Sequence, residues 1–176
     1  WHLWANSTNH SKEENQFVPP GPYRLGFDGY WAGYNFWHRY YQAFYYEDTP
    51  ERIAVNGYEP DVQTDLAIGW LRERRDPAKP FALFLNYGTP HDPWQWDNVP
   101  PEYAALFRDV PFDLPPNYAD GSAEYWGLRM DRRWWLENVK PNIPTWQQVY
   151  HAMIANLDWN LGRLLAALDQ AGLRDD

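Results

Sequence analysis

The 176-residue sequence contains no cysteine, which excludes disulfide bonds, thiolate metal ligands and a thiol nucleophile. It also has no run approaching the roughly 18 consecutive apolar residues of a membrane-spanning helix, so no such span is expected. Positive charge is scarce, with 15 Lys and Arg against 24 Asp and Glu and a formal net charge of −9. This balance argues against a nucleic-acid partner, because a phosphate backbone requires a basic surface.

Aromatic residues are abundant instead, at 19% of the chain, with 12 Trp and 13 Tyr. Trp and Tyr combine an apolar ring with a polar group, so they suit both loop packing and stacking against sugars. Packing of long loops onto a core is one interpretation. The other is a carbohydrate-binding surface formed by five tryptophans, which are Trp94, Trp96, Trp126, Trp134 and Trp135.

Glycine, proline and hydrophobic periodicity divide the chain into four stretches. Residues 1–58 form an aromatic loop region, with a short hairpin or edge strand expected at 51–58 around Asn56-Gly57. Residues 59–92 contain a helix, a core strand and a turn. Residues 93–144 are a second loop region, with a helical turn near 102–108, and residues 145–173 form a long helix.

Two helices follow from apolar residues at i, i+4 spacing, over 61–75 and 145–171. Thr145 and Gln148 match a capping box at the start of the second helix. Its predicted buried stripe consists of Val149, Met153, Leu157, Leu161, Leu164 and Leu168.

The segment 81–87, FALFLNY, is the clearest predicted strand. Its apolar residues are continuous rather than alternating, which indicates a strand buried on both faces of an α/β sheet. One strand cannot form a sheet alone, so we expect the chain to be an internal segment of a larger α/β protein. The competing hypothesis is a mostly helical, loop-rich domain.

His91 follows this strand in the turn Gly88-Thr-Pro-His-Asp-Pro93. Ligands of open α/β sheets bind beyond the carboxyl ends of the strands. Pro90 and Pro93 restrict the backbone on both sides of the imidazole, which suits a general acid that must be held near its leaving group. A histidine that only caps the turn is the structural alternative.

Several motifs occur in a defined order along the chain. They are Trp1-His2-Leu3, Gly26-Phe27-Asp28, Gly33-Tyr34-Asn35, residues 57–68, residues 80–93 and residues 150–173. Their order and spacing resemble the sulfatase family of the alkaline-phosphatase-like superfamily. The resemblance implies an α/β fold, a fragment of an alkaline-phosphatase-like sheet sandwiched by helices and rich in long aromatic loops.

The resemblance also implies a sulfuric ester hydrolase that uses a formylglycine nucleophile and a divalent cation, usually calcium. His2 then assists the nucleophile, and His91 contacts the sulfate and protonates the leaving oxygen. His38, Asp92 and Trp94 are the candidate substrate-binding residues. No metal ligand is assigned, because the family's nucleophile and metal motifs are absent from this sequence.

These absences lead us to expect that N- and C-terminal parts of the catalytic domain lie outside this chain and that the chain alone is inactive. The expected substrate is a small-molecule or glycan sulfate ester, and the expected location is periplasmic or secreted rather than cytoplasmic. Two alternatives remain open. One is a phosphate or phosphonate ester hydrolase of the same superfamily, and the other is a non-catalytic carbohydrate-binding module.

Overall fold

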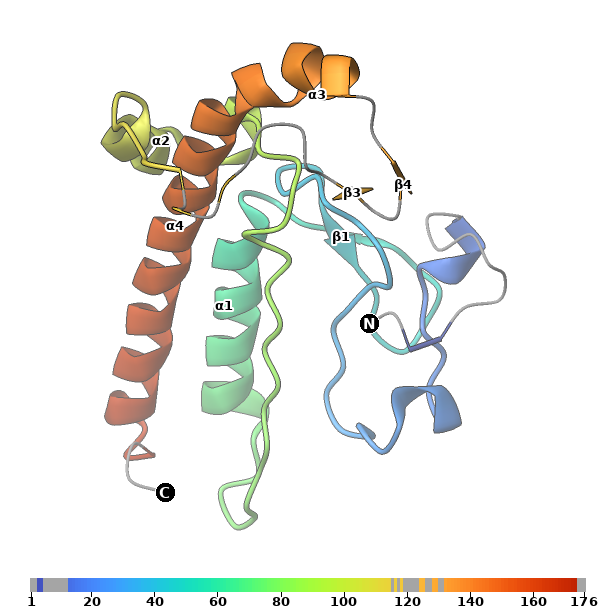
Figure 1. The fold of residues 1–176 in the computed structure, drawn as a ribbon. Helices are drawn as coiled ribbons and strands as arrows, with labels where there is room; N and C mark the ends of the chain where they lie inside the picture. The colour runs from blue at the N-terminus through green and yellow to red at the C-terminus, as the bar shows by residue number, and fades with distance from the viewer. Residues whose placement is uncertain are drawn as a thin grey trace.

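The computed structural model describes residues 3–4, 13–114, 116, 118, 124–125, 128–129 and 132–173 (Figure 1). Its α-helices are α1 (Glu59–Gly69), α2 (Pro101–Phe107), α3 (Arg132–Asn138) and α4 (Ile143–Gln170). Its strands are β1 (Phe44–Tyr45), β2 (Ile53–Ala54), β3 (Glu124–Tyr125) and β4 (Leu128–Arg129). A π-helical turn, Trp70–Arg74, continues α1, and 3₁₀ turns lie at Glu13–Asn15, Pro22–Arg24, Trp96–Asn98 and Lys140–Asn142.

Helices α1 and α4 lie side by side, and α2 packs against α4 (Figure 1). Helix α1 begins with Pro60 in its first turn, where a missing N–H costs nothing, and with the acids Glu59 and Asp61 near its positive dipole end. None of the described helices is long and apolar enough to cross a membrane.

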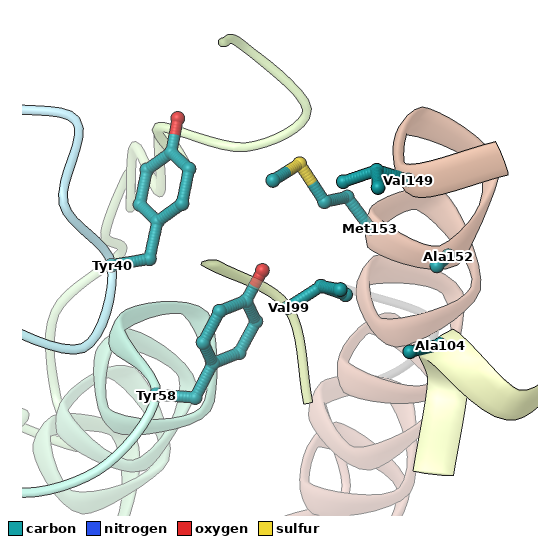
Figure 2. Close-up of a cluster of buried hydrophobic side chains, with 7 residues drawn as sticks. All are labelled: Tyr40, Tyr58, Val99, Ala104, Val149, Ala152 and Met153. Atoms are coloured by element: carbon teal, nitrogen blue, oxygen red, sulfur yellow. The ribbon is translucent and has the colours of Figure 1, made fainter. Parts of the chain in front are cut away.

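A cluster of buried side chains joins these helices to the loop that carries Tyr40 (Figure 2). It consists of Tyr40, Tyr58, Val99, Ala104, Val149, Ala152 and Met153. Met153 extends from α4 toward Tyr40, and both side chains are fully buried. The cluster therefore fixes the position of the Tyr40 loop relative to α4.

The helix predictions are confirmed for α1, for α2 near 102–108 and for α4. The capping box is wrong, because α4 begins at Ile143 and the side chain of Gln148 donates to the carbonyl of Val110 at 3.1 Å. The predicted stripe is correct at Val149 and Met153 but not at Leu161, which is 49% exposed.

Two buried asparagines replace the expected leucines at the interface between α1 and α4. Asn156 and Asn160 donate to one carboxylate oxygen of Asp61, at 2.9 and 2.7 Å. Arg163 donates to Asn160 Oδ1 at 2.9 Å and also pairs with Asp65. The carboxylate of Asp61 thus selects polar partners on α4, which an apolar pattern does not predict.

The prediction of a buried strand at 81–87 is wrong for the described residues. The segment is extended but pairs with no described strand, and Phe81 and Phe84 are 39% and 65% exposed. It runs back along α1, with Trp70 and Phe81 rings 5.3 Å apart and the hydroxyls of Thr64 and Tyr87 2.7 Å apart. Without a neighbouring strand, an extended segment leaves backbone groups to solvent and is not a sheet.

The described sheets are smaller than the helix-covered sheet expected from the resemblance. Strands β1 and β2 pair antiparallel, with Phe44 opposite Ala54, and β3 pairs antiparallel with β4. A strand does occur within 51–58, but its partner precedes it, so the expected turn at Asn56-Gly57 is not the hairpin turn. The described residues show no sheet sandwiched by helices, because the extended segment 81–87 pairs with none of them.

We expect Asn160→Ala to lower the free energy of unfolding by about 1–3 kcal/mol, because Asp61 and Arg163 lose a buried hydrogen-bond partner. The control is Asp158→Ala, an exposed residue on the same helix, for which the change should stay within about 0.5 kcal/mol. Urea unfolding measures both. Equal effects of the two substitutions would show that the asparagine–aspartate contact does not stabilise the interface.

Candidate functional site

His91 lies in the predicted turn at the end of the extended segment. The backbone N–H of His91 donates to the carbonyl of Gly88 at 3.2 Å, and the Thr89-Pro90 and Asp92-Pro93 peptide bonds are cis. The segment 81–87 runs antiparallel to α1, so it brings this turn to the end of the molecule where α1 begins (Figure 1).

Tyr40 holds the turn that carries His91 through hydrogen bonds from its hydroxyl group. Its ring is fully buried, and its hydroxyl lies 3.1 Å from the carbonyl oxygen of Gly88 and 3.0 Å from that of His91, so it donates to this pair of acceptors. A Cβ atom at position 88 would lie 2.9 Å from Cε1 of Tyr40, closer than real Cβ contacts allow. Glycine at 88 is therefore required for Tyr40 to reach the turn.

Asn98 is the second anchor of the same loop. Only 3% of Asn98 is exposed, and its Oδ1 accepts from the backbone N–H of Tyr40 at 2.9 Å. Its Nδ2 donates to the carbonyls of His38 and Pro93, each at 3.2 Å. One carboxamide thus ties the segment before Tyr40 to the segment after His91.

The imidazole of His91 is oriented by Asp92 and His38. Nδ1 of His91 lies 2.5 Å from Oδ1 of Asp92 and 3.0 Å from the carbonyl oxygen of Asp92. The ring stacks on that of His38, with centroids 4.1 Å apart and planes 6° from parallel. The side chain is 46% exposed, and no described residue hydrogen-bonds its Nε2. With Nδ1 engaged, Nε2 is the nitrogen that can exchange a proton with a bound molecule.

Trp94 packs between the turn and α4. Its indole N–H donates to the carbonyl of Pro90 at 2.8 Å, and its ring lies 5.8 Å from Trp146 and 6.2 Å from Tyr150 of α4. The indole therefore anchors the turn to α4.

The structure brings three of the five predicted site residues together, namely His38, His91 and Asp92. Trp94 is close in sequence but directed toward α4, and His2 lies outside the described residues. The roles assigned to all five stay predictions. Sequence patterns missed Tyr40 and Asn98, because their hydrogen bonds join segments that are far apart in the sequence.

Glu59 is a buried carboxyl that the sequence analysis also missed. It is 1% exposed, and its Oε1 accepts from the hydroxyl of Tyr34 at 2.5 Å and from Nε2 of Gln63 at 2.9 Å. No described residue hydrogen-bonds Oε2. Burial raises the pKa of the Glu59 carboxyl from 4.5 to about 7, against the lowering effect of the bond from Tyr34.

Glu59 is linked to the histidine turn through Tyr40. The backbone N–H of Glu59 donates to the carbonyl of Tyr40 at 2.9 Å. A cavity of about 30 Å³ adjoins Glu59, Tyr34 and Gln63, and this volume exceeds the roughly 10–15 Å³ that one water molecule requires. The buried carboxyl group of Glu59 thus belongs to a residue that is bonded directly to Tyr40, the residue that holds the histidine turn.

In the part of the chain that the structure describes, no three His, Asp or Glu side chains gather as a metal-binding group. The described residues therefore do not fit the divalent cation implied by the resemblance. What they do present is a carboxylate-held imidazole on a clamped, half-exposed turn, an arrangement suited to general acid–base catalysis.

The family model for sulfatases matches residues 1–176, the whole chain. The chain therefore belongs to the sulfatase family. It is 35% identical over 81 residues to an N-acetylglucosamine-6-O-sulfatase of Bacteroides thetaiotaomicron, covering 46% of this chain and 14% of that protein. It is 34% identical over 104 residues to the uncharacterised sulfatase YdeN of Escherichia coli, covering 58% and 17% of the two chains.

Two solved structures share the fold. The first is yidJ of Bacteroides fragilis, described as a candidate sulfatase, with a TM-score of 0.66 and 24% identity over 99% of this chain and 36% of that one. The second is a Bacteroides thetaiotaomicron protein (BT33494S-sulf) from work on the metabolism of multiple glycosaminoglycans, with a TM-score of 0.71 and 22% identity over 94% and 32%. This chain spans about a third of the solved structures and less than a fifth of the curated relatives.

We expect Tyr40→Phe to lower the free energy of unfolding by about 1–3 kcal/mol, because the ring packing stays while the carbonyls of Gly88 and His91 lose the tyrosine hydroxyl as a donor. The ring-current shift of the His91 imidazole should change with it in NMR spectra, since the stacking on His38 loosens. The matched control is Tyr41→Phe, whose ring is 40% exposed. Identical stability losses in the two variants would show that the hydrogen bonds of the Tyr40 hydroxyl do not stabilise the turn.

The raised pKa of the Glu59 carboxyl predicts that the stability of the chain depends on pH. Its pKa is higher in the folded chain, so the folded state holds an extra proton between pH 4.5 and about 7, and stability falls as pH rises through that window. Between pH 4.5 and about 7, the free energy of unfolding of the wild type should fall by up to about 3 kcal/mol relative to that of Glu59→Gln. Urea unfolding at a series of pH values measures the difference. The exposed Glu73→Gln should keep the wild-type slope, and parallel curves for wild type and Glu59→Gln would contradict the burial effect.

Proposed function

We propose that this chain forms part of a sulfuric ester hydrolase, in which His91 protonates the leaving oxygen of the ester. The observation that carries the proposal is the orientation of one imidazole, with Nδ1 held 2.5 Å from Asp92 and its ring stacked on His38. Membership of the sulfatase family and similarity to a protein named N-acetylglucosamine-6-O-sulfatase support it.

The chemistry requires such a group. Cleavage of the S–O ester bond leaves an alkoxide, which is a poor leaving group unless a proton reaches the oxygen as the bond breaks. The carboxylate of Asp92 holds Nδ1, which leaves Nε2 as the nitrogen available to a bound ester. Nε2–H can then donate its proton to the ester oxygen, and the ring becomes neutral as the alcohol departs.

The rest of the site is proposed to come from outside the described residues. By family resemblance, His2 assists the nucleophile, and a formylglycine nucleophile and a divalent cation such as calcium complete the site with residues that this chain does not contain. A periplasmic or secreted location stays a prediction of the same resemblance. The substrate class is a small-molecule or glycan sulfate ester, in line with the names of the relatives.

The alternative of a carbohydrate-binding module finds little support in the tryptophans. Trp94 packs against α4, Trp135 is 4% exposed, and Trp96 packs against the buried cluster beneath the guanidinium of Arg108. Trp134 is 47% exposed, and Trp126 lies outside the described residues. Most of these indoles pack against other parts of the chain, so they do not form a continuous surface on which a sugar could stack.

We expect His91→Ala in the full-length protein to lower kcat for a sugar sulfate by about 10²–10⁴-fold, because the alkoxide leaves unprotonated. The loss should be much smaller for 4-nitrophenyl sulfate, whose phenolate leaves without a proton. His151→Ala is the matched control, since His151 stacks on Phe112 away from the turn. Equal losses on both esters would remove His91 from the role of general acid.

The same assay separates the phosphate or phosphonate alternative. Initial rates on paired sulfate and phosphate esters of one alcohol show which oxyanion the site prefers. A sulfuric ester hydrolase should favour the sulfate ester, and a preference for the phosphate ester would overturn the proposed substrate class.

A further inference from the structure

We propose that Arg39 and Gln95 form a second anion-binding subsite beside His91, which accepts a carboxylate or sulfate elsewhere on the substrate. The proposal rests on the proposed function, because it concerns the recognition of a sulfate ester by the same site. It assigns the substrate class as an ester that carries an additional oxyanion near the scissile sulfate.

The backbone fixes Arg39 next to the reacting imidazole. Its two neighbours in sequence both contact the histidine turn, since His38 stacks on His91 and Tyr40 donates to the carbonyl of His91. The carbonyl of Arg39 accepts from the backbone N–H of Gln42 at 3.0 Å and from the indole N–H of Trp37 at 3.2 Å. Arg39 thus belongs to a loop whose position is set by several hydrogen bonds.

The side chain contacts the segment that follows the turn. Nη1 of Arg39 donates to Oε1 of Gln95 at 3.3 Å. Gln95 follows His91 by four residues, and its backbone is held by bonds from its N–H to the carbonyl of Pro93 at 3.0 Å and from Asn98 to its own carbonyl at 2.9 Å. Arg39 and Gln95 are both exposed. The guanidinium therefore bridges the loop that carries His38 to the segment that follows His91.

The charge of Arg39 is not matched by a carboxylate in the described part of the chain. Five other arginines pair with acids there, namely Arg24, Arg52, Arg74, Arg133 and Arg163. Arg39 has only the neutral carboxamide of Gln95 as a side-chain partner among the described residues. In a chain of net charge −9, an exposed arginine that follows His38 and has no acidic partner among the described residues is available for an anionic ligand.

The chemistry of the pair selects an oxyanion. The guanidinium presents a planar fork of N–H donors that matches two oxygens of a carboxylate or sulfate. The carboxamide of Gln95 holds one side of that fork and adds N–H donors of its own. Arg39 and Gln95 make no contact with the scissile sulfate in this proposal, so they determine specificity rather than chemistry.

The test compares Arg39→Gln with wild type in the full-length protein on three sulfate esters of one sugar. One is otherwise neutral, one carries a neighbouring carboxylate, and one carries a second sulfate. The ratio of kcat/KM for either anionic ester to that of the neutral ester should fall by about tenfold to a hundredfold, mainly through KM. Raising the salt concentration should lower the same ratio in the wild type.

Arg39→Lys keeps the charge without the planar fork, so its ratio should lie between those of wild type and Arg39→Gln. The matched control is Arg72→Gln, because Arg72 is an exposed arginine that donates to the carboxamide of Gln170 at 2.7 Å at the other end of α1. Arg72→Gln should keep the wild-type ratio.

The outcomes separate this inference from the proposed function. If Arg39→Gln and wild type show the same ratio, the subsite is wrong, whatever happens to the absolute rates. A fall in the ratio for only one anionic ester supports the subsite and identifies its ligand as carboxylate or as sulfate. If the wild type hydrolyses none of the three esters, the proposed function fails, and this inference fails with it.

Discussion

The candidate site depends on one hydroxyl group. Tyr40 is buried among residues of α2, α4 and the loop before α2, and from there it donates to the carbonyls of Gly88 and His91. A short turn has few contacts of its own, so its geometry is set by what holds its carbonyls. Tyr40 belongs to the buried cluster (Figure 2), so the packing of the helices determines where the turn and its imidazole lie.

The helices and the extended segment give the turn its location. Helix α1 runs away from the site, and residues 81–87 return along it with Tyr87 bonded to Thr64. The stacked pair of His38 and His91 then forms where the returning segment meets the Tyr40 loop. Residues separated by about fifty positions in sequence are brought into contact in this way. The carboxamide of Asn98 stabilises this contact, because it hydrogen-bonds to the backbone of both Tyr40 and Pro93.

The sequence predicted the features that depend on near neighbours. The spacing of apolar residues located α1 and α4, and two prolines around His91 located the turn. Tyr40 and Asn98 could not be found this way, because their partners lie up to 60 residues away. Asn160 was missed for a related reason, since a buried amide is explained only by the carboxylate of Asp61 opposite it. The strand at 81–87 was overpredicted because apolar composition does not show whether a partner strand is present.

That unpartnered segment has a practical consequence for handling the chain. Phe84 is 65% exposed on an extended backbone that no described strand covers. Open edges of this kind act as templates onto which another chain can add by backbone hydrogen bonding. Production of these 176 residues by themselves would therefore favour self-association, and a charged residue in place of Phe84 would be the natural way to keep the preparation monodisperse.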